Sequence, residues 1–325
     1  MRRRVWFCGA WLLLVPASAL AQSDFPSRPV HVVVGFGAGS AADLTARVLS
    51  QRLTQTMGQP FIVEIKPGGG STVAAEQVAR APKDGYTLFI GTVAVIINGL
   101  LQPNPRVNLA KVFAPISLAT SSPNVLVVKP SLGVANVKEL IALAKEKPGQ
   151  LNFGTSGFGT SPHLTGELFN IMAGTKIVSV HYAGSAQALT DLLGGRIQAM
   201  FSPASTVLAH VDSGELRGLA TSELTRTAAA PNLPTVSEAG LPGFDTSLWF
   251  GVVAPLGTPQ PVVDKLAAAI GEALKDAEVV KPLKLAGLDV RPMGPAEFAA
   301  YIASESKKYG DVVAAADLAP TAKDK

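Results

Sequence analysis

Residues 32–44 have the sequence Val32-Val33-Val34-Gly35-Phe36-Gly37-Ala38-Gly39-Ser40-Ala41-Ala42-Asp43-Leu44. An apolar run rich in β-branched residues stops at a glycine cluster, and polar residues then lead into a helical pattern. This order predicts a strand, a tight loop and a helix. Because the first N–H groups of a helix have no partner within it, such a loop favours an anion. Which anion it binds, if any, decides the function.

Length and composition indicate a folded protein with more than one domain. The 325 residues exceed what a single core usually holds, so we expect two domains. With 47% apolar and 16% charged residues and a mean hydropathy of +0.30, the chain can bury sizeable cores.

The N-terminus has the form of a secretory signal peptide. Met1-Arg2-Arg3-Arg4 precedes an apolar run over residues 5–17, and Ala19-Leu20-Ala21 fits a cleavage site, so we expect residues 1–21 to be removed after Ala21. The remaining chain has 25 basic and 24 acidic residues. A net charge of about +1 gives no electrostatic reason to expect nucleic acid or a membrane surface as partner.

The rest of the chain is expected to lack thiol chemistry. Its only cysteine, Cys8, lies in the leader, so we expect no disulfide and no cysteine-ligated metal. No run of 18 or more apolar residues follows the leader. We therefore expect a soluble exported protein, most simply a periplasmic one.

Short apolar runs alternate with amphipathic segments, which predicts an α/β fold with mostly parallel sheets flanked by helices. A strand-like region, Val112–Val128, is expected to be interrupted at residues 121–124, and helices Pro261–Asp276 and Pro295–Ala315 are expected to close the chain. This layout fits two lobes. One comprises residues 24–124 plus 245–325, the other residues 125–244, and the hinge is expected near Asn124 and Asp245.

By motif alone, the first loop also fits a dinucleotide-binding fingerprint. Gly37-x-Gly39-x-x-Ala42 follows a strand and opens a helix, and Glu64 ends the next strand, where a ribose-binding acid belongs. An exported nicotinamide-dependent oxidoreductase of the Rossmann type therefore remains an alternative. Export counts against it, because the periplasm lacks a free nicotinamide pool.

Hydrolase and metal chemistry have weaker support. Two Ser-containing loops, Gly154–Phe158 and Gly159–His163, lack the final glycine of a nucleophile elbow. The four histidines show neither a triad order nor HExxH spacing. We therefore expect no catalytic residue, no metal and no cofactor.

The distinctive feature is repetition, since several strand ends lead through small polar residues into helix starts. They are Gly37–Asp43, Gly91-Thr92, Thr155–Ser161, Gly184-Ser185 and Ser202–Thr206. Ligands of parallel α/β sheets gather at the carboxyl ends of strands, so these loops can converge in one cleft between lobes. Backbone N–H groups and hydroxyls can bind a carboxylate there without a formal positive charge.

Motifs along nearly the whole mature chain, from Phe25 to the last helix, resemble those of one family. They are Asp84-Gly85-Tyr86-Thr87-Leu88, Leu151-Asn152-Phe153, Gly159-Thr160-Ser161-Pro162-His163-Leu164, Ala188-Leu189-Thr190-Asp191-Leu192-Leu193-Gly194-Gly195, Pro234-Thr235-Val236-Ser237-Glu238-Ala239-Gly240 and Trp249-Phe250-Gly251. In order and spacing the chain is similar to the extracytoplasmic solute-binding proteins of tripartite tricarboxylate transporters, the Bug family.

The resemblance implies a two-lobed type II periplasmic-binding-protein fold. It implies closure on a small organic carboxylate, and we leave open a monocarboxylate, a dicarboxylate or an aromatic carboxylate. It also implies delivery to membrane permease subunits, without catalysis, and we expect a monomer. A ligand-sensing partner of a membrane receptor would share the fold and the pocket, and remains a second alternative.

The resemblance also implies where the ligand binds. The first loop, the glycine-rich loop of the second lobe and Thr92 would hold the carboxylate, with Asp43 facing the ligand's far end. The candidate ligand-binding residues are Phe36, Ala38, Gly39, Ser40, Asp43, Thr92, Ser156, Gly157, Phe158, Gly159, Thr160, Ser161 and Ser202.

The chain departs from the family pattern at positions that bear on the ligand. Gly35, Ala38 and Ser40 replace two prolines and a glycine of the usual Pro-Phe-x-Pro-Gly-Gly-x-x-Asp loop. Ala183 replaces a common lysine, and Ser202 replaces a common aspartate. Because these charged partners are missing, we expect a carboxylate with an apolar or aromatic body rather than an amino acid or a tricarboxylate.

Overall fold

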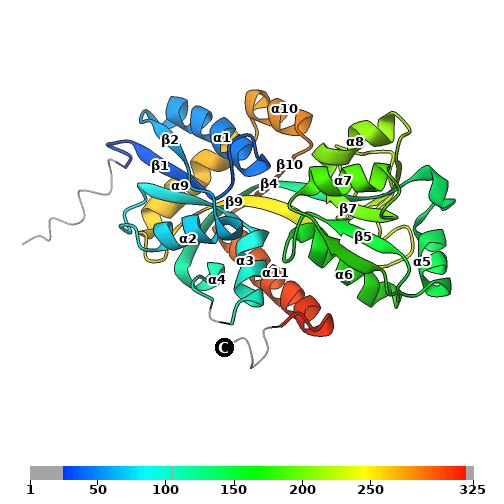
Figure 1. Ribbon diagram of the computed structural model, residues 1–325. Helices are drawn as coiled ribbons and strands as arrows, with labels where there is room; N and C mark the ends of the chain where they lie inside the picture. Colours follow the sequence, from blue (N-terminus) through cyan, green and yellow to red (C-terminus); the bar gives the residue numbers. More distant parts are fainter. Residues whose placement is uncertain (1–24, 104, 320–325) are drawn as a thin grey trace, which may run out of the picture.

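The computed structural model describes residues 25–103 and 105–319. The predicted signal peptide, residues 1–21, lies outside the described residues. Two lobes lie side by side, and two long strands run between them (Figure 1). We call the part built on β1–β3, β9 and β10 the first lobe, and the part built on β5–β8 the second lobe.

The first lobe contains a mixed sheet. Its strands are β1 (Val30–Val34), β2 (Phe61–Ile65), β3 (Thr87–Thr92), β9 (Ser247–Pro255), β10 (Asp289–Met293) and the first part of β4 (Phe113–Val128). β1 pairs in parallel with β2 and with β3. β9 is antiparallel to both β3 and β4, and β10 is antiparallel to β4.

Helices cover both faces of this sheet. They are α1 (Ala41–Met57), α2 (Thr72–Ala79), α3 (Val93–Leu101), the short α4 (Leu109–Val112), α9 (Gln260–Ala273), α10 (Ala277–Leu285) and α11 (Pro295–Ala315). In α1, Ala42, Ala46, Leu49 and Leu53 form one buried face at helical spacing. Across residues 25–103 and 105–319, no helix has the length and apolar character needed to cross a bilayer.

The second lobe repeats the α/β arrangement. It contains β5 (Asn152–Thr155), β6 (Val178–His181), β7 (Ala199–Pro203), β8 (Arg217–Thr221), α5 (Val137–Glu146), α6 (Ser161–Ala173), α7 (Ser185–Leu193) and α8 (Ala204–Asp212). β5 pairs in parallel with β6 and with β7, whereas the end of β4 is antiparallel to β7 and β8. The central layer therefore runs from one lobe into the other through β4.

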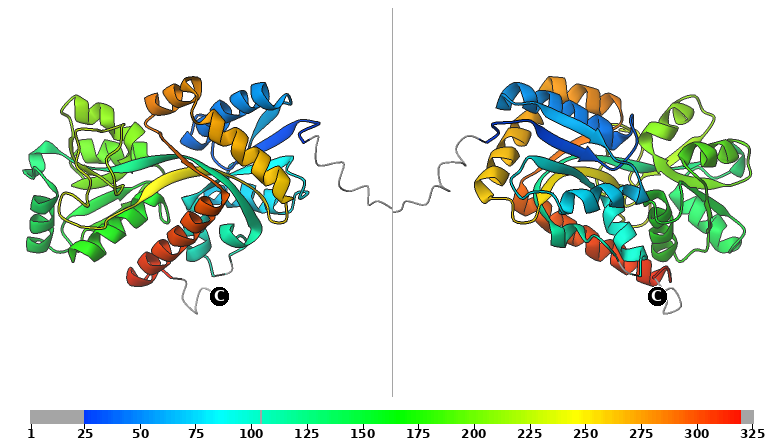
Figure 2. Two further views of the ribbon diagram at one scale, coloured as in Figure 1. Left: turned by 180° about the vertical axis from the view of Figure 1, so that it is seen from behind. Right: turned by 60° about the vertical axis from the view of Figure 1, so that its left-hand side comes forward.

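The prediction that residues 121–124 interrupt β4 was wrong, because the strand is continuous from Phe113 to Val128. Pro123 pairs with Ser247 of β9, and the next residue, Asn124, pairs with Pro203 of β7. The strand changes partners between these two residues. Figure 2 shows from behind how the long strands run from one lobe into the other. The N–H that Pro123 lacks is tolerated because the ladder already breaks there.

The sequence analysis missed four elements of the first lobe: α3, the short α4, α10 and β10. α3 is almost wholly apolar and β-branched, so it has no helical period. α10 carries Pro282 in its interior, which argues against a helix. β10 is short and only partly buried, and it forms a strand by pairing with β4.

The opening run Val32-Val33-Val34 is apolar throughout because both faces of its strand are covered. Val32 and Val34 belong to the core cluster that includes α1 and α9, whereas Val33 belongs to the cluster on the other face, which includes α3 and α11. A parallel strand covered on both faces shows a continuous apolar run rather than alternation.

Gly35 and Gly37 differ in the space available for a side chain, which gives a prediction. A Cβ on Gly35 would lie 2.6 Å from Ser71 Cα, a backbone atom, whereas a Cβ on Gly37 would meet no atom within 4 Å. We expect Gly35→Ala to lower the unfolding free energy by about 1–3 kcal/mol, and Gly37→Ala to change it by less than about 0.5 kcal/mol. Urea unfolding of both variants measures this, and equal stabilities would contradict it.

Candidate ligand-binding cleft

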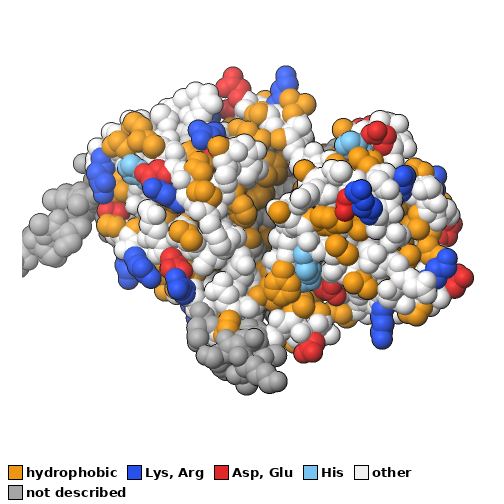
Figure 3. All heavy atoms as spheres, in the orientation of Figure 1, with side chains coloured by type: hydrophobic (Ala, Val, Ile, Leu, Met, Phe, Trp, Pro, Cys, Tyr) orange, Lys and Arg blue, Asp and Glu red, His pale blue; other side chains and the backbone are white. Residues whose placement is uncertain are grey.

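A cavity of about 510 Å³ lies between the two lobes. In the space-filling view, hydrophobic side chains line the cleft, and charged side chains lie mainly on the outer faces (Figure 3). Both lobes and β9 contribute to its wall. The lining residues are Phe36, Ser40, Ala41, Ala42, Gly70, Thr92, Val93, Ala94, Asn98, Ser156, Gly157, Phe158, Gly159, Thr160, Ser161, Pro162, Tyr182, Ala183, Pro203, Leu248 and Phe250.

Three helices begin at this cavity. The first residues of α1, α3 and α6 all belong to its wall, which brings N-termini from both lobes together. Each N-terminus carries roughly half a positive charge and N–H groups without a partner in the helix. Since none of the described residues lining the cavity is Lys, Arg, His, Asp or Glu, these backbone groups are the main positive potential in it.

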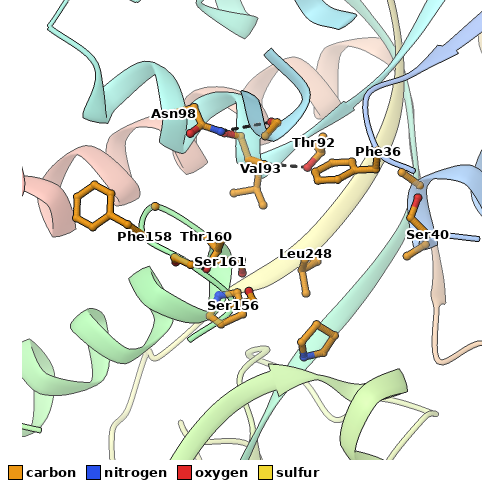
Figure 4. A pocket seen from close by; sticks show the side chains of 18 of the residues that line it. Phe36, Ser40, Thr92, Val93, Asn98, Ser156, Phe158, Thr160, Ser161 and Leu248 are labelled. Atoms are coloured by element: carbon orange, nitrogen blue, oxygen red, sulfur yellow. Dashed lines mark hydrogen bonds between the residues drawn. The ribbon is translucent and has the colours of Figure 1, made fainter. Parts of the chain in front are cut away.

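Side chains from the two lobes face one another across the cavity (Figure 4). On the first-lobe side, Thr92 caps α3 by accepting from the Ala94 N–H at 3.2 Å. On the second-lobe side, Thr160 donates its hydroxyl proton to the Gly157 carbonyl at 2.8 Å. Leu248 of β9 lies between them and gives this part of the wall an apolar surface.

A buried histidine shapes the second-lobe loop before α6. The Gly159 N–H donates to His163 Nδ1 at 3.1 Å, and His163 is only 1% exposed. Burial and, to a smaller extent, the neighbouring His181 lower the pKa of His163 from 6.5 to about 4. A neutral ring keeps Nδ1 as an acceptor, so the loop geometry depends on an uncharged His163.

Phe158 lies at the rim of the cavity rather than at its centre. Its side chain is 56% exposed. Its ring centroid lies 5.1 Å from that of His163 and 5.6 Å from that of His181. Figure 4 shows the ring directed away from Leu248 and Ser161.

Nine of the predicted site residues therefore line one cavity: Phe36, Ser40, Thr92, Ser156, Gly157, Phe158, Gly159, Thr160 and Ser161. The other four do not. Ala38 and Gly39 are exposed in the first loop, and the Ser202 side chain is wholly buried behind the wall formed by Pro203.

Asp43 is the fourth predicted residue outside the cavity wall, and its side chain bonds to its own loop and to α1. One carboxylate oxygen accepts from the Gly39 N–H at 2.8 Å, and the other lies 2.8 Å from Arg47 Nε. The Asp43 N–H in turn donates to the Ser40 hydroxyl, which makes a reciprocal cap like a capping box. The side chain is 3% exposed and forms no part of the wall. This geometry gives no support to the implied role of facing the ligand's far end.

Twelve of the lining residues were not among the predicted site residues, and three of these lie on α3. Val93, Ala94 and Asn98 line the cavity only because Val93–Leu101 is a helix, which the sequence pattern did not predict. Asn98 is fixed by bonds from its amide to the carbonyls of Ala94 (2.8 Å) and Gly70 (3.3 Å). An asparagine in an otherwise apolar run was the one available signal.

Comparison with known proteins identifies the family. The model of the tripartite tricarboxylate transporter family receptor matches residues 45–318. The chain belongs to this family. It is 34% identical to protein BugT of Bordetella pertussis over 299 residues, which covers 91% of this chain and 92% of BugT. The protein is therefore a solute-binding receptor and not an enzyme.

Solved structures of similar receptors support the same fold. Rpa4515 of R. palustris, solved with adipate, has a TM-score of 0.78 and 34% identity, covering 91% of this chain and 100% of that one. MatC of Rhodopseudomonas palustris, solved with malate, has a TM-score of 0.73 and 32% identity, covering 89% and 100%. The two-lobed periplasmic-binding-protein fold is thus confirmed, and the oxidoreductase alternative is excluded.

The buried state of His163 gives a pH prediction. Its folded-state pKa lies below its unfolded value, so its contribution to stability is present above about pH 6.5 and is lost as the pH falls toward 4. In His163→Gln, whose amide oxygen can still accept from Gly159, this loss is absent. We expect the stability advantage of the wild type to shrink by up to about 2 kcal/mol between pH 7 and 5.

Urea unfolding of both proteins across this range measures the difference. Burial raises the pKa values of Glu223 and Glu305, but both groups are present in both proteins, so their effects cancel. Parallel stability curves for wild type and variant would contradict the prediction.

Proposed function

We propose that this receptor captures a small organic carboxylate in the cleft between its lobes and delivers it to membrane permease subunits of a tripartite tricarboxylate transporter. The observation that carries the proposal is the convergence of the α1, α3 and α6 N-termini on one uncharged cavity. Their N–H groups and the hydroxyls of Ser40, Thr92 and Ser161 suit a carboxylate. Similar receptors have been solved with adipate and with malate.

The ligand that suits this cavity best has one carboxylate and an apolar or aromatic body. Phe36, Val93, Leu248 and Phe250 supply apolar wall, and Ala183 occupies the rim position where relatives commonly carry lysine. A second carboxylate buried without a cation or further donors would lose hydration without compensation. This supports a monocarboxylate over a dicarboxylate such as adipate.

Closure would occur about the strands that join the lobes. Lobes of residues 24–124 plus 245–325 and of residues 125–244 are supported by two features: β4 changes partners between Pro123 and Asn124, and β9 begins at Ser247. A rotation there would move the starts of α1 and α3 relative to α6. Closure around the ligand would exclude water and present one shape to the permease.

The site of action would be the periplasm, reached by cleavage of the signal peptide after Ala21, and the protein would work as a monomer. The arginine-rich start and apolar run of residues 1–17 support export. Membership in a receptor family of tripartite transporters supports the permease as partner.

Ligand binding should raise the melting temperature, because the ligand binds only the folded state. We expect hexanoate or benzoate to raise it and the uncharged analogue hexanamide to leave it unchanged. We expect Ser161→Ala to weaken hexanoate binding about tenfold, since it loses one hydrogen bond to a charged group. Ser304→Ala, on the exposed face of α11, is the matched control. Equal shifts with hexanoate and hexanamide would refute a carboxylate site.

A lysine at the rim should change which carboxylate binds best. Ala183 lines the cavity, whereas the nearby exposed residue Ala186 does not. We expect Ala183→Lys to strengthen the binding of adipate relative to that of hexanoate by roughly two- to fivefold, the usual range for a partly exposed ion pair. Calorimetric titration of both acids measures the ratio, with Ala186→Lys as the control of equal charge. An unchanged ratio in Ala183→Lys would argue that the second carboxylate does not reach this rim.

A further inference from the structure

A cluster of buried polar residues lies where the two joining strands meet the second lobe. Asn124 of β4, Ser222 after β8 and Thr246 before β9 are all 0% exposed. The Asn124 N–H donates to the Ser222 hydroxyl at 2.9 Å, and this hydroxyl donates to the Thr246 carbonyl at 2.7 Å. The Ser222 N–H donates to the Asn124 carbonyl at 2.9 Å. Both joining strands are therefore bound to one point, which we call the strand junction.

The strand junction is bonded directly to the helix that begins at the cavity. The Asn124 side-chain amide donates to the Ser161 hydroxyl at 3.0 Å and to the Thr165 hydroxyl at 3.3 Å. The Thr165 hydroxyl is also within 2.9 Å of the Thr246 hydroxyl. The first turn of α6 is thus held by hydrogen bonds from both strands that would form the hinge.

These bonds determine what the Ser161 hydroxyl can do. A hydroxyl has one proton and two lone pairs, and Ser161 uses a lone pair to accept from Asn124. The buried phenol of Tyr309 lies beside the same hydroxyl and can donate to its second lone pair. With both lone pairs used in this way, the Ser161 proton is left for an acceptor in the cavity, whose wall includes Ser161. The Asn124 amide oxygen is buried without a hydrogen-bond partner, so the residue is held there at a cost in stability.

The same region contacts the first lobe. Leu164, three residues into α6, is fully buried in the core cluster that contains Ile97 of α3 and Tyr309 of α11. The start of α6 therefore lies close to the place about which the lobes would rotate. Groups near a rotation axis move least, so Ser161 would keep its position while Ser40 and Thr92 move.

We propose that Asn124 is a positioning residue for the ligand, one that acts through Ser161. By accepting from Asn124, Ser161 presents its hydroxyl proton to the carboxylate and ties the carboxylate's anchor to the strand junction. This inference rests on the proposed function. The inference goes beyond the proposed function because it assigns the first contact of the ligand's carboxylate to the start of α6, at the hinge, before the first-lobe loops close.

The test is a double-mutant cycle on the full mature chain, with hexanoate and adipate as probes in calorimetric titrations. We expect Asn124→Ala and Ser161→Ala each to raise the Kd about tenfold. The double variant should be no weaker than Ser161→Ala alone, because Asn124 acts through that hydroxyl. Additive losses, about a hundredfold in the double variant, would overturn the proposal.

Asn124→Asp keeps the side-chain size but places an acceptor next to Ser161. The Ser161 proton would then turn to Asp, so we expect a larger loss of hexanoate affinity than in Asn124→Ala, with a native far-UV spectrum. The matched control is Asn170→Ala. Asn170 holds the other end of α6 through bonds to Thr175 and Ile177 and does not line the cavity. It should lower the melting temperature without changing the Kd.

The remaining outcomes are also decisive. Unchanged affinity in both Asn124 variants, with a normal loss in Ser161→Ala, would overturn the positioning role and leave the proposed function intact. A wild type that binds neither hexanoate nor adipate would overturn the inference together with this ligand class. Trp249, the one tryptophan after residue 21, is fully buried in the first-lobe core, so its emission reports whether each variant keeps the native packing of that core.

Discussion

One strand, β4, forms hydrogen bonds with strands of both lobes, and the arrangement of the two lobes follows from that constraint. Its first part pairs with β9 and β10, and its last five residues pair with β7 and β8. One residue of a strand cannot hydrogen-bond to two neighbouring strands on the same edge. The change of partner strand therefore has to fall at a single step, between two consecutive residues. Pro123 and Asn124 occupy this step, where the missing N–H of Pro123 costs least and the side chain of Asn124 can hold α6.

The second constraint is electrostatic. An anion site built from lysine or arginine would need those charges solvated or paired in the empty cleft. Helix N-termini avoid this, because their partial charges are fixed in the backbone and cannot be lost by titration. The rest of the wall is then free to be apolar, as Phe36, Leu248 and Phe250 are. Specificity can therefore change through single rim positions such as Ala183 without rebuilding the anion site.

Local patterns in the sequence predicted most elements, because strand and helix periods are local properties. The candidate residues came from the loops at strand ends together with the family resemblance, and nine of them line one cavity, since the ends of parallel strands meet at one edge of a sheet. What the sequence could not supply depends on tertiary contacts. α3 is buried against α11, and this burial removes the amphipathic period by which helices are recognised. The direction of the Asp43 side chain also depends on such contacts. Gly39 and Arg47, both within about one helical turn, bind its carboxylate and keep it from facing the cavity.

The glycine-rich loop shows why a dinucleotide motif can occur in a solute-binding receptor. Two of its three glycines have separate local explanations. Gly35 passes against the Ser71 backbone, and Gly39 has a φ of +79°, which a side chain would strain. Gly37 has neither constraint. Glu64, the acid expected to bind a ribose, instead places its Oε1 2.6 Å from His31 Nδ1. A tight turn from a parallel strand into a helix needs glycines for steric reasons alone, so the motif identifies the turn and its exposed N–H groups. The surroundings of the loop, here the starts of α3 and α6, determine which anion those groups can hold.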